Sequence, residues 1–419
     1  MRISMVSEHA SPLAVLGGVD AGGQNVHVAA LSTALARRGH EVCVYTRRDD
    51  AALPERVPLA DGVEVVNVTA GPARPVPKDE LFPYMNDLAT GILDDWRRRR
   101  PDVVHGHFWM SGLAALTASC TEHLNHGGDR VPVVQTFHAL GTVKRRHQGA
   151  DDTSPAERER VEPWVARTVD TVLATCSDEV AELEAMGVDL AKVSVAPCGV
   201  DTTLLAPHGP AEARGRVHRI AVVGRLVPRK GTDLVIEALA QLTAAGRDDV
   251  ELVIVGGSGG ASAAEDPECL RLAALAKAAG VAERVSLRGS LAHDDLPQFF
   301  RSCDAVVCAP WYEPFGIVPL EAMACGVPVI AARVGGLTDS IVDGVTGLHV
   351  PPRDPAAIAA ALIRILDDAP FARALGKAGR ERTERLYTWD RVAQLTEEVY
   401  DRLLGASMAR IEPAALVGL

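Results

Sequence analysis

The segment from Pro310 to Gly336, PWYEPFGIVPLEAMACGVPVIAARVGG, constrains the fold most, because it predicts several consecutive elements and the turns between them. A helix is predicted to begin near Gly316, since Pro319 is tolerated only in a first helical turn. Gly326 can end that helix in a left-handed conformation. Apolar strands flank the loop and helix, at Ala305–Cys308 and Val327–Ala331. The segment therefore predicts a strand–loop–helix–strand unit.

Two carboxylates frame this unit, Glu313 in the loop and Glu321 about one turn into the helix. A helix N-terminus carries roughly half a positive charge and favours an anion. The free backbone N–H groups there belong to Phe315, Gly316 and Ile317. The pattern suits a ligand with a phosphate at one end and hydroxyls at both. Surface glutamates are common, so the spacing by itself also fits an ordinary strand–loop–helix unit.

The composition is that of a globular protein, and it excludes several classes. The 419 residues predict two or three domains, and the net charge of −12 argues against general nucleic-acid binding. The eight cysteines form no C-x-x-C pair, which favours a reducing cytoplasm. No apolar run approaches the 18 residues of a membrane helix. We therefore expect a cytoplasmic protein without a transmembrane segment, and leave a homodimer open.

Two successive strand–helix series predict an α/β fold of two doubly wound, Rossmann-like domains that face each other across a cleft. The first spans residues 1–205 and the second residues 206–387, and an amphipathic helix at 388–404 follows. Turn formers from Cys198 to Gly215 indicate the linker. Within the first domain we expect a long helix at Glu80–Arg100 and a polar, basic loop at Gly141–Ser154.

Three further features predict ligand contacts. A glycine-rich loop at residues 17–23 precedes a helix, and its Gly22 and Gly23 allow close backbone approach to a ligand, although a tight structural turn would also explain them. Arg225 and Lys230 follow the first strand of the second domain, where cations would hold a diphosphate; an exposed basic loop is the alternative. His138 follows a strand at 131–136 and is predicted to reach the carboxyl edge of the sheet.

These motifs together resemble the donor site of the retaining GT-B glycosyltransferases, the family that includes sucrose-phosphate synthases and the actinobacterial glycosyltransferase that acts on inositol phosphate in mycothiol synthesis. The resemblance covers nearly the whole chain. It rests on these stretches: Asp20–Val26, Arg225 to Gly231, Glu-Pro-Phe-Gly from Glu313, and Glu-Ala-x-Ala-x-Gly-x-Pro-Val from Glu321.

The resemblance implies a nucleotide-sugar donor, with UDP favoured and GDP open, retention of the anomeric configuration, and an α-glycosidic product. It implies that the final helix crosses back to the first domain. Catalytic roles fall to Glu313, His138, Arg225 and Lys230. Donor contacts fall to Gly22, Gly23, Arg225, Lys230, Glu313, Phe315, Gly316, Ile317 and Glu321. No cofactor and no metal are expected, and no residue is expected to act as a covalent nucleophile.

On the acceptor side, the resemblance implies contacts from Asn25, Lys78, Phe108, Ala139 and Arg158. In the mycothiol enzyme, a Lys, a Tyr, a Thr and an Arg hold the acceptor phosphate. Lys78 and Arg158 match two of these, but Phe108 and Ala139 stand at the Tyr and Thr positions and lack the hydroxyls. Each lost hydrogen bond weakens phosphate binding by about 1 kcal/mol. An unphosphorylated polyol, aminocyclitol or sugar is therefore an equal candidate for the acceptor.

Two other functions remain as alternatives. A nucleotide-sugar epimerase shares the two-domain architecture but lacks the Glu-Pro-Phe-Gly segment with its second glutamate. A non-catalytic nucleotide-sugar sensor or scaffold would bind the donor without turnover, and the joint presence of Arg225, Lys230, Glu313 and Glu321 speaks against it.

Overall fold

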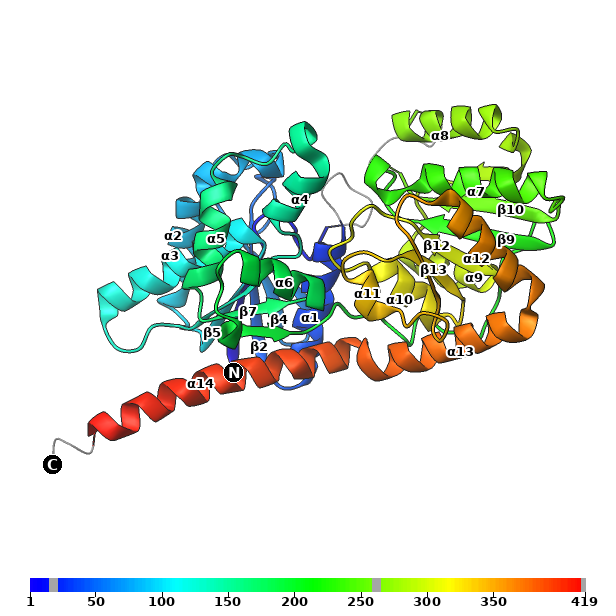
Figure 1. Ribbon diagram of the computed structural model, residues 1–419. Coiled ribbons are helices and arrows are strands. Elements are labelled where there is room, and N and C mark those ends of the chain that lie inside the picture. Colours follow the sequence, from blue (N-terminus) through cyan, green and yellow to red (C-terminus); the bar gives the residue numbers. More distant parts are fainter. Residues whose placement is uncertain (15–21, 258–264, 416–419) are drawn as a thin grey trace. The chain divides into compact units, whose positions relative to one another are not determined.

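The computed structural model describes residues 1–14, 22–257 and 265–415, with side chains described as far as Gly405. The greater part of the predicted glycine-rich loop lies outside these residues. The chain divides into two compact units (Figure 1). The first contains the described chain up to Pro197 and again from Trp389, and the second is Cys198–Thr388. The division thus falls at the beginning of the predicted linker.

The first unit is built on an eight-stranded sheet that is parallel except for one edge pair. In spatial order its strands are β3 (Arg56–Ala60), β4 (Val63–Val68), β2 (Glu41–Arg47), β1 (Arg2–Val6), β5 (Val103–His107), β6 (Val133–Thr136), β7 (Thr171–Ala174) and β8 (Val193–Val195). Strand β3 pairs antiparallel with β4 and was not predicted, since its pattern Arg-Val-Pro-Leu-Ala is short and carries a proline.

Helices cover both faces of this sheet, as the apolar strand pattern requires. They are α1 (Gly23–Arg37), α2 (Met85–Trp96), α3 (Trp109–His126), α4 (Gly141–Gln148), α5 (Arg158–Thr168), α6 (Ser177–Ala185) and α14 (Trp389–Ala415). One core joins the sheet to α2, α3 and α5, and another joins it to α1 and α14. Helix α14 therefore belongs to the first unit although it follows the second in sequence, as the resemblance implied.

The second unit has a six-stranded, fully parallel sheet with helices on both faces. Its strands in spatial order are β11 (Val285–Leu287), β10 (Val250–Val255), β9 (His218–Val223), β12 (Ala305–Cys308), β13 (Val329–Ala332) and β14 (Leu348–Val350). Its helices are α7 (Thr232–Ala244), α8 (Pro267–Ala278), α9 (Leu296–Arg301), α10 (Ile317–Ala324), α11 (Leu337–Ser340), α12 (Pro355–Asp367) and α13 (Ala369–Leu386). The two doubly wound domains of the predicted α/β class are confirmed.

Two local predictions for the first unit are wrong. The expected long helix at Glu80–Arg100 is only α2, since residues 78–84 form short 3₁₀ turns around Pro83. The expected loop at Gly141–Ser154 begins with helix α4. The basic side chains of α4 pair with acidic residues that are distant in sequence: Arg146 with Glu182 at 2.5 Å, for example. These ion pairs offset the electrostatic repulsion between neighbouring basic side chains of α4.

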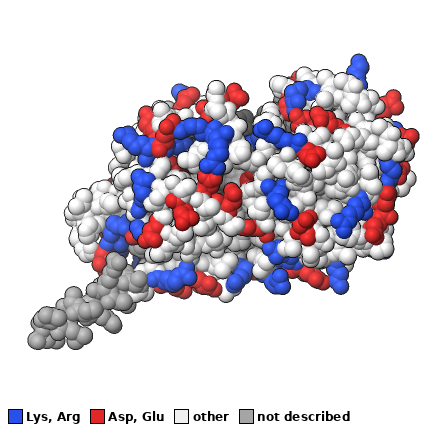
Figure 2. Space-filling view, in the orientation of Figure 1, with Lys and Arg blue, Asp and Glu red and all other residues white. Residues whose placement is uncertain are grey.

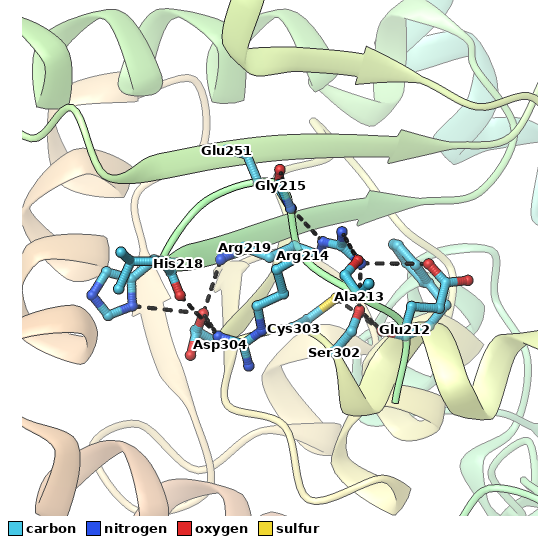
Figure 3. Close-up of polar contacts among 12 residues, drawn as sticks. Glu212, Ala213, Arg214, Gly215, His218, Arg219, Glu251, Ser302, Cys303 and Asp304 are labelled. Atoms are coloured by element: carbon cyan, nitrogen blue, oxygen red, sulfur yellow. Dashed lines mark hydrogen bonds and ion pairs between the residues drawn. The ribbon is translucent and has the colours of Figure 1, made fainter. Parts of the chain in front are cut away.

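A buried arginine at the amino ends of the second unit's strands forms hydrogen bonds both to the linker and to residues of the sheet (Figure 3). Arg219 in β9 is 6% exposed. Its guanidinium donates to Glu251 at 2.6 Å, to Ser302 at 2.7 Å and to the carbonyl of Ala213 at 2.7 Å. The charge is thus paired and hydrogen-bonded, as a buried cation requires. This network lies at the end of the sheet opposite to the loops described below.

Charges of both signs alternate over the described surface on the face drawn in Figure 2. The four-arginine run at residues 97–100 follows α2, and each of its members pairs with an acidic residue. It therefore offers no concentrated positive field for a polyanion. Within the described chain, no helix is long and apolar enough to cross a membrane.

Candidate functional site

The carboxyl ends of β9, β12 and β13 carry the residues that the sequence singled out in the second unit. These strands are neighbours in the sheet, so the loops that follow them meet at one edge. Helix α10 begins at Ile317 with Gly316 as its N-cap, as predicted, and Gly326 ends it at φ +74°. Within the described residues, the backbone N–H groups of Phe315, Gly316 and Ile317 have no acceptor. The three donors on which the predicted anion site depends are thus available, and the binding of an anion there stays a prediction.

The loop after β9 and the loop after β12 meet through an ion pair. Lys230 Nζ lies 2.5 Å from Glu313 Oε2, and both side chains are largely buried. Arg229 lies 3.7 Å from the same oxygen and stacks on the ring of Tyr312. Burial raises the pKa of Glu313, but Lys230, Arg229 and Arg225 outweigh this effect, so the pKa is lower than usual. Glu313 therefore stays ionised at neutral pH.

Close backbone contacts hold this ion pair in place. Gly335 follows β13 at φ +48°, and a Cβ there would lie 2.0 Å from the carbonyl oxygen of Glu313. The neighbouring Gly336 N–H donates to that oxygen at 3.1 Å. On the other side, a Cβ on Gly231 would lie 2.1 Å from the carbonyl oxygen of Ala309. Only glycine allows these approaches, which explains why Lys-Gly and Val-Gly-Gly occur here.

Glu321 has a different environment from Glu313. It lies on α10, its side chain is 11% exposed, and no described group donates a hydrogen bond to it. Burial raises its pKa to about 7. The imidazole of His293 lies close to it, with Nε2 4.0 Å from Oε1. A buried carboxylate with free acceptor sites is suited to receive two hydroxyl donors from a ligand.

Arg225 lies in the loop directly after β9 and is exposed. It belongs to the same loop cluster as Lys230, because its charge contributes to the lowered pKa of Glu313. The structure thus brings together Arg225, Lys230, Glu313, Glu321 and the N-terminus of α10.

In the first unit, His138 lies just after β6, at the carboxyl edge of the sheet as predicted. It is one of few non-glycine residues with positive φ, at +60°. Such a conformation costs about 1 kcal/mol or more and is often found at functional sites. Its Nε2 lies 3.0 Å from Nδ1 of His107, the last residue of β5. Burial lowers the pKa of both imidazoles well below the usual value. The two rings are therefore neutral.

Gly22 and Gly23 lie at the beginning of α1. Gly22 is the N-cap of α1, Gly23 is its first residue, and a Cβ on Gly22 would meet nothing within 4 Å. Asn25 is buried, accepts from the N–H of Gly22 at 2.9 Å and donates to the carbonyl of Ser11 at 2.9 Å. The Asn25 side chain thus links Gly22 to Ser11, while its predicted contact with an acceptor stays a prediction.

Three of the five predicted acceptor residues meet behind the carboxyl end of β6. Arg158 is 3% exposed and lies over the ring of Phe108, with its guanidinium carbon 4.9 Å from the ring centroid. Its guanidinium donates to the carbonyl of Ala139 at 2.6 Å and pairs with Glu162 at 2.8 Å. The positive charge of Arg158 is therefore already balanced. Lys78 is half-buried and is the first residue of the 3₁₀ turn Lys78–Glu80, and its predicted contact with an acceptor stays a prediction.

Sequence reasoning missed Arg229, His293, His107 and Glu162. Arg229 precedes Lys230 in the sequence, and the structure places both beside Glu313. The pairing of Arg158 with Glu162 had a sequence signal, because residues i and i+4 of a helix lie side by side. The other contacts join different elements and had none. Among the described residues, His27, His107 and His138 form the group with the spacing to hold a metal ion.

Comparison with known proteins adds independent evidence. The family model described as Glycosyltransferase Family 4 matches residues 21–204, and the model described as Glycosyl transferases group 1 matches residues 211–382. A D-inositol 3-phosphate glycosyltransferase from Acidothermus cellulolyticus is 38% identical and covers 95% of this chain and 90% of its own length. One from Kribbella flavida is also 38% identical, with 95% of each chain covered. The solved sucrose-phosphate synthase from Thermosynechococcus elongatus matches with a TM-score of 0.84 at 30% identity and covers 97% of this chain and 99% of its own.

Proposed function

The chain belongs to the group 1 glycosyl transferases of GT-B architecture, and from this premise we propose that it transfers a sugar from a UDP-sugar to a hydroxyl of a small, unphosphorylated polyol, aminocyclitol or sugar, with retention of configuration. The transferred sugar is a hexose or an N-acetylhexosamine. The observation that carries the donor half of this proposal is the cluster of Lys230, Glu313 and Glu321 around the N-terminus of α10.

In this proposal the diphosphate lies against the N-terminus of α10 and the cations Arg225 and Lys230. A diphosphate departs as an anion, so it needs positive charge and N–H donors rather than a proton donor. Lys230 pairs with Glu313 in the free protein, and the diphosphate would share that cation. Glu321 has no hydrogen bond of its own and would accept both ribose hydroxyls. Each group thus meets a part of the ligand that complements its charge.

The mechanism is proposed to run without a covalent sugar–enzyme intermediate or a catalytic metal. Glu313 is held as a carboxylate by Lys230 and Arg229, which makes it a positioning and electrostatic group. The leaving diphosphate would take the proton of the acceptor hydroxyl as the new bond forms on the same face of the sugar. His138, whose ring is neutral, would hydrogen-bond the transferred sugar.

The acceptor is proposed to lack a phosphate, unlike the substrate named for the relatives. Arg158 is neutralised by Glu162 and covered by Phe108, and it also donates to the carbonyl of Ala139. A phosphate would have to displace a buried carboxylate from this guanidinium. Displacement of a buried partner costs several kcal/mol, which few phosphate contacts would return. Because Phe108 has no hydroxyl, its ring cannot donate a hydrogen bond to a phosphate.

The test combines a donor screen with an acceptor screen. The purified chain is incubated with UDP- and GDP-sugars, each with myo-inositol, inositol phosphate and a panel of aminocyclitols and monosaccharides, in the presence of EDTA. We expect nucleotide diphosphate release with an unphosphorylated acceptor, and an α-linkage in the NMR spectrum of the product. Preferred use of inositol phosphate would refute the acceptor class. A β-linked product would refute retention, and loss of turnover in EDTA would refute metal independence.

A further inference from the structure

Three histidines from different parts of the first unit meet near the carboxyl edge of its sheet. His27 comes from α1, His107 ends β5, and His138 follows β6. One ring nitrogen of each lies within 4.8 Å of those of the other two. The ring centroids of His27 and His138 are 4.9 Å apart. The proposed reaction assigns a role to His138 alone.

The hydrogen bonds of the cluster are incomplete, in contrast to those of its neighbour His105. The Thr136 hydroxyl donates to the carbonyl of Leu173 and therefore accepts from Nε2 of His105, whose Nδ1 accepts from the Tyr400 hydroxyl. His105 is thus fully satisfied. Nδ1 of His27 and Nε2 of His107 are buried and have no partner among the described residues. Buried polar atoms without a partner are rare and ask for an explanation.

The chemistry of the three rings is that of metal ligands. Burial lowers the pKa of all three imidazoles, that of His27 to about 4, so each ring is neutral at neutral pH and has one nitrogen lone pair. The proton shared between the facing nitrogens of His107 and His138 has to shift to the other nitrogen of its own ring before both facing nitrogens can bind an ion, but no ring has to lose a proton to solvent. Neutral imidazole suits zinc, copper and nickel, whereas magnesium and calcium prefer oxygen. The nitrogens therefore select a borderline transition-metal ion.

We propose that His27, His107 and His138 form a reversible site for a divalent transition-metal ion of the zinc class, and that the bound ion stops sugar transfer by holding His138. The binding part stands on the geometry of the three rings. The inhibitory part rests on the proposed function, because it needs His138 to contact the transferred sugar. The site is distinct from the metal-assisted catalysis that some transferases use, since the ion would block the reaction and not promote it.

The distances set the expected strength of the site. Three nitrogens on one tetrahedral zinc ion lie about 3.3 Å apart, for Zn–N bonds of about 2.0–2.1 Å. His107 and His138 are already 3.0 Å apart at their facing nitrogens, so His27 has to move toward them. No described carboxylate hydrogen-bonds any of the three rings, and such partners normally strengthen a metal site. We therefore expect a weak, exchangeable site.

The movement of His27 provides a signal that does not depend on activity. The ring of Trp389 at the beginning of α14 meets His27 edge-on, with centroids 5.4 Å apart. Metal binding at His27 is therefore expected to change the fluorescence of Trp389. Copper and nickel would in addition give absorption bands typical of nitrogen ligands.

The experiment uses the full chain freed of metal by a chelator and then titrated with Zn²⁺ or Ni²⁺. Calorimetry measures stoichiometry, tryptophan fluorescence reports His27, and diphosphate release measures transfer. His27→Gln removes one ligand and keeps a polar side chain. The matched control is the double variant His123→Gln/His126→Gln, which removes the histidines at the end of α3 that would bind an ion adventitiously.

We expect one ion per chain, a fluorescence change that Trp389→Phe removes, and at least a tenfold loss of transfer that EDTA reverses. His27→Gln should weaken binding and inhibition at least tenfold, and the control should not. If no ion binds, the proposed site is wrong. It is also wrong if binding is lost in the control variant but kept in His27→Gln. A buried water would then satisfy the free nitrogens. If binding depends on His27 but sugar transfer is unchanged, then the proposed inhibition by the ion and the proposed contact of His138 with the sugar are both wrong. Turnover of the metal-free chain tests the proposed function separately.

Discussion

Replacement of Glu321 by glutamine should make the free protein more stable while it weakens nucleotide binding. The wild-type carboxylate is buried without a hydrogen-bond donor, and burial raises its pKa from 4.5 to about 7. One pKa unit corresponds to about 1.4 kcal/mol, so ionisation costs the folded protein roughly 3 kcal/mol. With 11% of the side chain exposed, solvent screens little of this cost.

The sign of the pH dependence follows from proton counts. Between pH 4.5 and about 7 the folded chain keeps a proton that the unfolded chain has lost, so the stability of the wild type falls as the pH rises through this window. The penalty is complete above this range. Glu321→Gln removes it, so the variant should equal the wild type near pH 4 and exceed it by up to about 3 kcal/mol near pH 8. For a unit of this size that is a rise in Tm of about 6–12 °C.

Differential scanning calorimetry from about pH 4 to pH 8 measures this difference, and calorimetric titration with UDP measures affinity in the same samples. The affinity of the wild type should rise with pH through about 7, and that of the variant should be lower and flat. Glu313→Gln is the matched control, because Glu313 has a lowered pKa; its removal should destabilise the protein above that pKa. A stability difference between Glu321→Gln and the wild type that does not change with pH would refute the reasoning.

Three other variants, one of them a double substitution, test the site. Lys230→Ala should lower kcat by about 10²–10³-fold and raise the Kd for the nucleotide diphosphate; an unchanged Kd in calorimetry contradicts its role. Gly335→Ala should destabilise the protein by about 1–3 kcal/mol in thermal melts, because its Cβ would meet the Glu313 carbonyl oxygen. The control is Gly344→Ala, since Gly344 also has a positive φ but a Cβ there would meet nothing within 4 Å. An equal loss of stability in both variants would contradict the steric argument. Phe108→Tyr combined with Ala139→Thr should raise kcat/KM for a phosphorylated acceptor by about fivefold per added hydroxyl, and no gain would leave the pairing of Arg158 as the dominant barrier.

The sequence by itself determined the elements and their order, and from them much of the donor site. Apolar strand runs separated by amphipathic helices specify parallel α/β units, and Pro319 and Gly326 place the ends of α10 within one or two residues. Because the carboxyl ends of parallel strands share one edge, the pattern also places Lys230 and Glu313 together, although 83 residues separate them. Local chemistry and a general topological rule were sufficient for these inferences.

Only the tertiary structure decided the charge state and the availability of the groups. Glu313 and Glu321 are both glutamates on one short segment, yet cations lower the pKa of the first and burial raises that of the second. Arg158 looked like a free phosphate ligand, but Glu162 and the ring of Phe108 occupy it. His27, His107 and His138 lie on different elements, and their spacing in the sequence does not indicate that they meet. Desolvation and pairing depend on what surrounds an atom in three dimensions, and a linear pattern of residue types does not contain that information.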